Sequence, residues 1–93
     1  MFTSTSNKGF SLTFENGWTI SVQFGYGNYC DNYRHPDGWD FSKKQEVTQS
    51  SAAEIAIWDA NGEWYNFGSD TVKGYCSANE VAECITKVSK FKP

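Results

Sequence analysis

Two Asn-Gly pairs, each set between runs of alternating apolar and polar residues, constrain the fold of this chain most strongly. The first, Asn16-Gly17, lies in segment 9–24, GFSLTFENGWTISVQF, and the second, Asn61-Gly62, lies in segment 54–67, EIAIWDANGEWYNF. Asn-Gly tolerates positive φ angles and is the strongest short-range signal for a β-hairpin. The sequence therefore predicts two antiparallel hairpins.

The length of the first turn follows from where the large apolar residues must lie. A two-residue loop would place the apolar residues of the two strands on opposite faces. A three-residue loop of residues 15–17 pairs Phe14 with Trp18 and gathers the large apolar residues of both strands on one face. Because a slip of one residue moves every side chain to the other face, we predict the three-residue loop. Gly17 is then the left-handed residue of a type I turn plus bulge.

The same reasoning predicts a loop of residues 60–62 in the second hairpin. The expected opposed pairs are Trp58 with Trp64, Ile57 with Tyr65, and Ile55 with Phe67. The two tryptophans then share a face that is otherwise polar. Either a loop or the N-terminal segment covers them, or they form an exposed patch for a partner, since aromatic residues are enriched at the centres of interfaces.

The last third of the chain predicts a helix on this sheet. Residues 77–80, Ser-Ala-Asn-Glu, have the pattern of a capping box, and a short strand is expected just before it at 71–75. Four apolar residues then recur at helical spacing: Val81, Cys84, Ile85 and Val88. We therefore predict an α+β fold, with two antiparallel hairpins forming one sheet of four to five strands and a C-terminal helix packed on one face.

Composition limits the class of protein. The 93 residues suffice for a single domain, 1–93, and residues 1–8 are expected to be a flexible N-terminus. Eight Lys and Arg against 11 Asp and Glu argue against a nucleic-acid-binding protein, which usually shows a clustered basic face. An aromatic content of 17% argues against disorder. No apolar run has the length of a membrane span, no signal peptide is recognisable, and three cysteines suggest reduced thiols in a cytosol.

The segment 25–51 between the hairpins is far longer than a usual connection of about 4–6 residues. Its five aromatic residues either form a second small core on the far face of the sheet or present themselves to a partner. The candidate partner-binding residues are Tyr26, Tyr29, Tyr33, Arg34, Trp39, Trp58 and Trp64.

Residues that could carry chemistry form no recognisable site. A Cys-His nucleophilic pair needs hydrogen-bond reach and an orienting group, whereas Cys30 and His35 are separated by a turn-rich stretch. Those two residues with Cys76 and Cys84 would make four zinc ligands, but no C-x-x-C knuckle is present. We therefore expect no enzyme activity, no metal and no cofactor.

Three segments resemble a family of small bacteriophage-encoded proteins that has no assigned activity. They are 16–30, with the pattern NGWTISVQFGxGNYC, 53–62, with AEIAIWDxNG, and 72–82, with VKGYxSxxEVA. The resemblance implies a phage origin and a location in the bacterial host cytoplasm. Small phage proteins often bind and disable host proteins, including CRISPR and other defence machinery, so the implied partner is a bacterial host protein.

Three hypotheses about function follow. The first is a non-enzymatic phage accessory protein that binds and inhibits a host protein, as an anti-CRISPR or host-takeover factor does. The second is a small-molecule binder that sequesters a nucleotide immune signal, against which stands the shortage of cations, since Arg34 is alone until Lys43. The third is a minor phage structural or assembly protein. The two edges of the sheet, or the tryptophan faces, could also pair in a homodimer.

Overall fold

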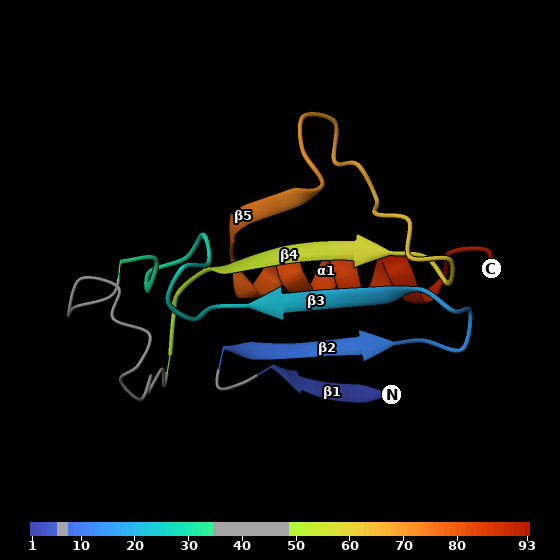
Figure 1. The fold of residues 1–93 in the computed structure, drawn as a ribbon, viewed down its shortest axis with the longest axis horizontal. Helices are drawn as coiled ribbons and strands as arrows, with labels where there is room; N and C mark the ends of the chain where they lie inside the picture. The colour runs from blue at the N-terminus through green and yellow to red at the C-terminus, as the bar shows by residue number, and fades with distance from the viewer. Residues whose placement is uncertain (6–7, 35–48) are drawn as a thin grey trace.

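A computed structural model describes residues 1–5, 8–34 and 49–93, which form one antiparallel sheet and one helix (Figure 1). The elements are β1 (Phe2–Thr5), β2 (Gly9–Thr13), β3 (Thr19–Gln23), β4 (Ala53–Trp58), β5 (Val72–Cys76) and α1 (Ala78–Ser89). The five strands lie side by side in the order of the sequence, and α1 packs on one face of the sheet. The predicted α+β architecture is confirmed.

The hairpin of β2 and β3 has the predicted turn and register. Gly17 has a φ of +88°. The Phe14 amide donates to the Trp18 carbonyl at 2.9 Å, and the Gly17 amide donates back to the Phe14 carbonyl at 3.0 Å. The three-residue loop brings Phe10 opposite Val22 and Leu12 opposite Ile20. The alternation of apolar residues was therefore sufficient to predict which side chains share a face.

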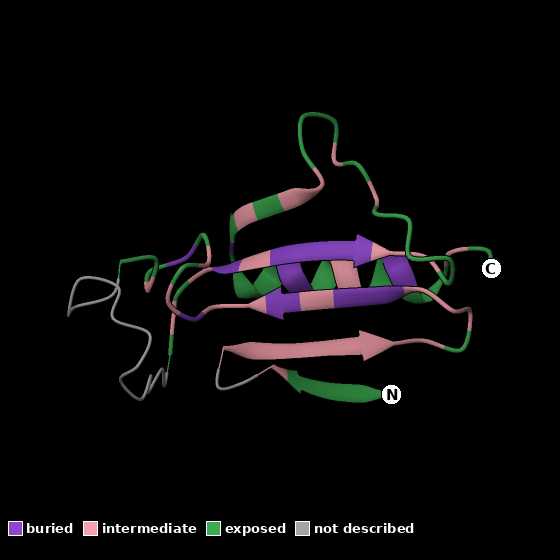
Figure 2. Cartoon of the chain, in the orientation of Figure 1, coloured by how far each residue is buried: buried purple, intermediate pink, exposed green. Residues whose placement is uncertain are grey.

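The core lies between α1 and the central strands. Figure 2 shows burial concentrated in β3 and β4, whereas β1 is exposed along most of its length. Ile20, Ile55 and Val88 are fully buried at its centre. Six aromatic residues pack against the core: Phe10, Phe14, Trp18, Phe24, Tyr65 and Phe67.

The predicted capping box forms at the start of α1. The Glu80 amide donates to the Ser77 hydroxyl at 3.2 Å, and the Ser77 amide donates to the Glu80 carboxylate at 3.0 Å. The hydrogen bond from the Ser77 amide, followed by the Ser77 side chain, holds the pKa of the Glu80 carboxyl below its usual value. Cys76 and Val81, which flank the box, are both buried and fix the angle at which the chain enters the helix.

The end of α1 is closed by a residue from the distant β2–β3 turn. The Asn16 side-chain amide donates to the Val88 carbonyl at 2.8 Å and to the Phe91 carbonyl at 2.9 Å. Its oxygen accepts from the Trp18 amide at 3.0 Å. Asn16 therefore does two things at once: it shapes its own turn and it ties that turn to the C-terminal end of α1.

The second Asn-Gly turn also forms. Gly62 has a φ of +80°, and its amide donates to the Asp59 carbonyl at 3.0 Å. Trp58 and Trp64 lie opposite each other in an isolated β-bridge, as predicted. The loop of residues 60–62 is thus confirmed.

The predicted second hairpin does not extend as far as Phe67. Ile55 lies opposite Lys73 of β5, so the predicted pairing of Ile55 with Phe67 is wrong. The rings of Tyr65 and Phe67 meet edge to face at 5.2 Å and pack against the core, and the chain that carries them turns back before β5. β5 pairs with β4 in the position that was expected for residues 64–67.

Residues 1–8 are not simply a flexible terminus, as was predicted, because Phe2–Thr5 form the edge strand β1. Thr3 lies opposite Ser11 of β2, and the Gln23 side-chain amide donates to the Thr5 hydroxyl at 3.1 Å. Polar composition suggested mobility, but threonine is β-branched and favours strands. On a polar sheet face, hydroxyl groups are what a strand should present.

Candidate binding face

The side of the sheet opposite α1 is called here the open face. The register places there every second residue of each strand. Over β1–β3 these residues carry mainly hydroxyl groups: Thr3, Thr5, Ser11, Thr13, Thr19, Ser21 and Gln23. Over β4 and β5 the open face carries aromatic and small residues. Its two halves therefore differ in chemistry.

The hydroxyl half is bonded within itself. The hydroxyls of Thr13 and Thr19 are 2.9 Å apart, and the Gln23 amide donates to Ser21 as well as to Thr5, each at 3.1 Å. These five side chains are therefore bonded to one another across β1, β2 and β3.

Two stacked tryptophans form one end of the aromatic half. The rings of Trp58 and Trp64 have centroids 5.4 Å apart and planes inclined by 29°. The turn between them is held by Asp59, whose carboxylate accepts from the Asn61 amide at 2.8 Å and from the Glu63 amide at 3.0 Å. Trp58 is half-buried, and Trp64 remains 51% exposed. The pair is a rigid aromatic surface in contact with solvent.

Three tyrosines form the other end of the aromatic half. Tyr29 and Tyr33 stack with centroids 5.4 Å apart and planes at 17°, and Tyr75 lies 6.4 Å from Tyr29 at 32°. Tyr29 is 46% exposed and Tyr75 59%. This tyrosine cluster, defined as Tyr29, Tyr33 and Tyr75, combines the loop after β3 with the edge strand β5.

The loop that carries Tyr29 is fixed to the sheet through its backbone. The Tyr29 amide donates to the Glu54 carboxylate at 2.7 Å, and the Tyr29 carbonyl accepts from the Tyr75 amide at 2.9 Å. A Cβ on Gly74 would lie only 2.6 Å from the Tyr29 Cβ. Gly74 therefore lets the loop approach the sheet closely, as a glycine inside a strand often does.

Tyr75 has an unusual backbone conformation. Its φ is +54°, and it lies where the register between β4 and β5 shifts. A bulky residue with positive φ typically costs about 1–3 kcal/mol, and such bulges re-aim side chains. Here the bulge places the ring beside Tyr29. Sequence reasoning missed Tyr75 as a site residue; the glycine before it, inside a strand, was the available signal.

The two clusters are separated by a short stretch of β4. Glu54 of β4 contacts the tyrosine cluster, and Trp58 of β4 belongs to the tryptophan pair. These two positions are four residues apart in the strand, and at about 3.3 Å per residue they are roughly 13 Å apart. Ala56 lies between them on the same face. The clusters therefore flank a patch of sheet with small side chains.

The structure brings four of the predicted binding residues into these clusters, namely Trp58, Trp64, Tyr29 and Tyr33. The exposure of Trp64 and Tyr29 contradicts a second core over these two residues. Of the other predicted residues, Tyr26 is half-buried, Arg34 is exposed, and Trp39 lies outside the described residues.

Hydrogen bonds join the two described parts of the connecting segment at a neck, defined as residues 31–32 and 49–51. The Asp31 carboxylate accepts from the Ser51 amide and hydroxyl, both at 2.7 Å, and these bonds lower the pKa of its carboxyl. The Asn32 side-chain amide donates to the Phe24 and Gln49 carbonyls. The loop bearing Tyr29 is thus fixed next to the start of β4.

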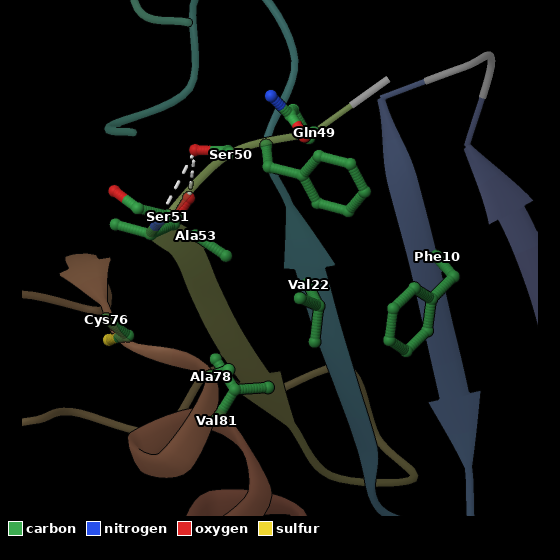
Figure 3. Close-up of a pocket in the computed structure, with 11 residues that line it drawn as sticks. Phe10, Val22, Gln49, Ser50, Ser51, Ala53, Cys76, Ala78 and Val81 are labelled. Atoms are coloured by element: carbon green, nitrogen blue, oxygen red, sulfur yellow. Dashed lines mark hydrogen bonds between the residues drawn. The ribbon is translucent and has the colours of Figure 1, made fainter. Parts of the chain in front are cut away.

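A cavity of about 320 Å³ lies on the helix side, between β2, β3, the neck and the start of α1 (Figure 3). Its apolar lining consists of Phe10, Val22, Phe24, Ala52, Ala53, Cys76, Ala78 and Val81. Ser50 at its rim donates its hydroxyl to the Ala52 carbonyl at 2.6 Å. Gln49 and Ser51 complete the lining, so the cavity is mainly apolar with polar groups along the neck.

The cysteines are structural in their surroundings. Cys30 is 2% exposed, and its thiol donates to the Gly25 carbonyl at 3.6 Å. Burial raises the pKa of the Cys76 thiol, which makes it a poor nucleophile. His35, the other member of the Cys-His pair weighed above, lies outside the described residues. In the described part of the chain, no three His, Cys, Asp or Glu side chains are grouped to hold a metal ion.

The described helix is too short and too polar to cross a membrane. Comparison of the chain with protein-family models, with curated proteins and with solved structures gives no match.

Proposed function

We propose that this chain is a non-enzymatic binding protein that captures another protein through the aromatic half of its open face. The observation that carries the proposal is the strained Tyr75, whose positive φ holds a 59% exposed ring in the tyrosine cluster. Strain of this kind persists where the surrounding structure enforces it, and it gathers at functional sites.

The chemistry of the face suits a protein partner. Tyrosine and tryptophan dominate the residues that contribute most to protein–protein binding, because they bury a large rigid area with little loss of side-chain entropy. The clusters are fixed before binding by Asp59 at one end and by Glu54 at the other. A net charge of −3 is unfavourable for nucleic acid.

The resemblance to small phage proteins supports a partner from the bacterial host, met in the host cytoplasm. Binding would inhibit that partner by covering a surface it needs, as an anti-CRISPR or other anti-defence protein does. The two clusters, roughly 13 Å apart, would contact one continuous patch of the partner.

Affinity capture from bacterial lysate with the immobilised chain, followed by mass spectrometry, tests the proposal. A host protein retained by the wild type should be lost with Trp64→Ala and with Tyr75→Gly. Thr86→Ala, an exposed position on the outer side of α1, is the matched control and should retain it. Circular dichroism melting of each variant separates lost binding from lost folding.

Two results would contradict the proposal. Retention of the same partner by both aromatic variants would remove the open face from its recognition. A thermal shift of the wild type with a cyclic nucleotide or an ADP-ribose derivative, abolished by Tyr75→Gly, would instead make the tyrosine cluster a small-molecule site.

A further inference from the structure

The two edges of the sheet are protected to different degrees. β5 carries the bulge at Tyr75 and a charged residue, Lys73, both of which hinder pairing with another strand. β1 has neither a bulge nor a charged residue, and no described strand pairs with its outer side. An unprotected edge is a template for strand addition.

The hydrogen-bond pattern identifies which residues of β1 face outward. Met1 and Thr13 exchange both backbone bonds, from the Met1 amino group at 2.7 Å and from the Thr13 amide at 2.8 Å. In an antiparallel ladder such pairs alternate with non-bonded pairs, so Thr3 is bonded to β2. The N–H and C=O groups of Phe2 and Ser4 therefore point away from the sheet.

We propose that β1 pairs with β1 of a second copy of this chain, about a twofold axis at Thr3. In this register Phe2 of each copy lies opposite Ser4 of the other, and the outward groups of both residues make four hydrogen bonds across the axis. Within the described strand Phe2–Thr5, a register centred on Phe2 or on Ser4 gives one such pair, with two bonds. The pairing extends the antiparallel sheet across the two copies, with both helices on the same side.

Side-chain packing selects the same register. Phe2 is 86% exposed, on the same side of the sheet as α1. Ser4 lies opposite Phe10, whose ring lines the cavity in Figure 3. In the dimer, Phe2 of the second copy lies over the small Ser4 side chain and reaches the Phe10 ring. The row of apolar residues that Ser4 interrupts is thereby continued, and an exposed phenylalanine is covered.

The oligomeric state of the full chain over a concentration series, measured by sedimentation, tests this proposal. The wild type should form a dimer that dissociates on dilution, since a four-residue strand gives a small interface. Phe2→Ser should raise the dissociation constant by roughly tenfold or more, because each dimer loses two buried rings. Ser4→Pro removes an outward N–H that β2 does not use, and should leave a folded monomer.

A cysteine pair tests the register directly. Thr3→Cys places two thiols face to face across the axis, with Cα atoms about 4.5 Å apart in a non-bonded pair, a distance compatible with a disulfide. Mild oxidation should link this variant into a dimer, whereas Thr5→Cys, also on the open face, should remain unlinked. The wild type under the same oxidant controls for the native cysteines.

A wild type that stays monomeric at every concentration would overturn the proposal. So would a dimer that survives both Phe2→Ser and Ser4→Pro, because another surface would then hold it together. Equal cross-linking of Thr3→Cys and Thr5→Cys would overturn the register. None of these outcomes depends on capture of a partner through the aromatic half.

Discussion

The two faces of the sheet are built from the same strands and behave differently. On the helix side, Ile20 and Ile55 are fully buried under α1 in ordinary strand geometry. On the open face, the large side chains stack on one another, remain about half exposed, and include Tyr75 with its positive φ. The helix side is thus a buried core, whereas the aromatic half of the open face is a solvent-exposed aromatic surface.

Under the proposed function, the helix side of the sheet provides stability and the aromatic half of the open face provides recognition. Burial of aliphatic side chains contributes most of the free energy of folding, whereas a half-exposed ring contributes little to it. A protein that uses one face for each purpose can lose residues of the second with a small change in stability. The following predictions test that division, starting with the largest expected effect.

Ile55→Ala should lower the free energy of unfolding by about 2–5 kcal/mol, because it leaves a cavity at a fully buried position. Trp64→Ala, which removes a larger side chain from the open face, should cost only about 1 kcal/mol through the lost stacking. Urea denaturation followed by circular dichroism measures both. Equal losses would mean that the tryptophan pair belongs to the core after all.

Asn16→Asp should lower the free energy of unfolding by about 2–3 kcal/mol. The carboxylate cannot donate to the Val88 and Phe91 carbonyls, and it places negative charge at the negative end of the helix dipole. Asn61→Asp is the matched control, since Asp-Gly serves the same kind of turn without a helix beside it, and it should change stability little. Thermal melts of the two variants give the comparison.

Tyr75→Gly should change the free energy of unfolding by less than about 1 kcal/mol, because glycine relieves the strain at positive φ while the ring contact is lost. Tyr29→Gly should cost more, since the Tyr29 side chain packs on Gly74 and no strain is relieved. If Tyr75→Gly lowered the free energy of unfolding more than Tyr29→Gly, the Tyr75 ring would have a structural role, and its strain would no longer support a binding site.

The smallest expected effect is at the neck. The pKa of the Asp31 carboxyl is lowered in the folded chain, so its contribution to stability is present above the usual value of 3.8 and is lost as the pH falls through the folded pKa. Protection of the Ser51 amide against exchange, taken relative to the intrinsic exchange rate at each pH, should therefore fall only in acid. Asp31→Asn should show no such step, and a step that persists in it would have another origin.

The sequence correctly predicted the features that depend on residues close together in the chain. The register of β2 and β3 follows from alternation around Asn16-Gly17, and the start of α1 follows from the capping box at Ser77 and Glu80. The placement of Trp58 opposite Trp64 follows from the second turn. Each of these features depends on residues within a few positions of one another.

The features that were missed depend on contacts distant in sequence. Asn16 caps a helix end more than seventy residues away. Tyr75 lies in the tyrosine cluster because the loop that carries Tyr29 approaches Gly74. The second hairpin ends before Phe67, whose ring packs against the core instead of continuing the strand. β1 was missed because residues 1–8 were predicted to be a flexible N-terminus. No periodicity in one segment reveals which distant segment will lie beside it.

The order of the strands also has a consequence for how fast the chain reaches its fold. β1, β2 and β3 follow one another closely in the sequence, so their pairings have low contact order and should form within microseconds. The pairing of β3 with β4, which places Ile20 beside Ile57, must close residues 24–52 into a loop first. We expect that closure to limit the folding rate, and substitutions in β4 to slow folding more than substitutions in β1.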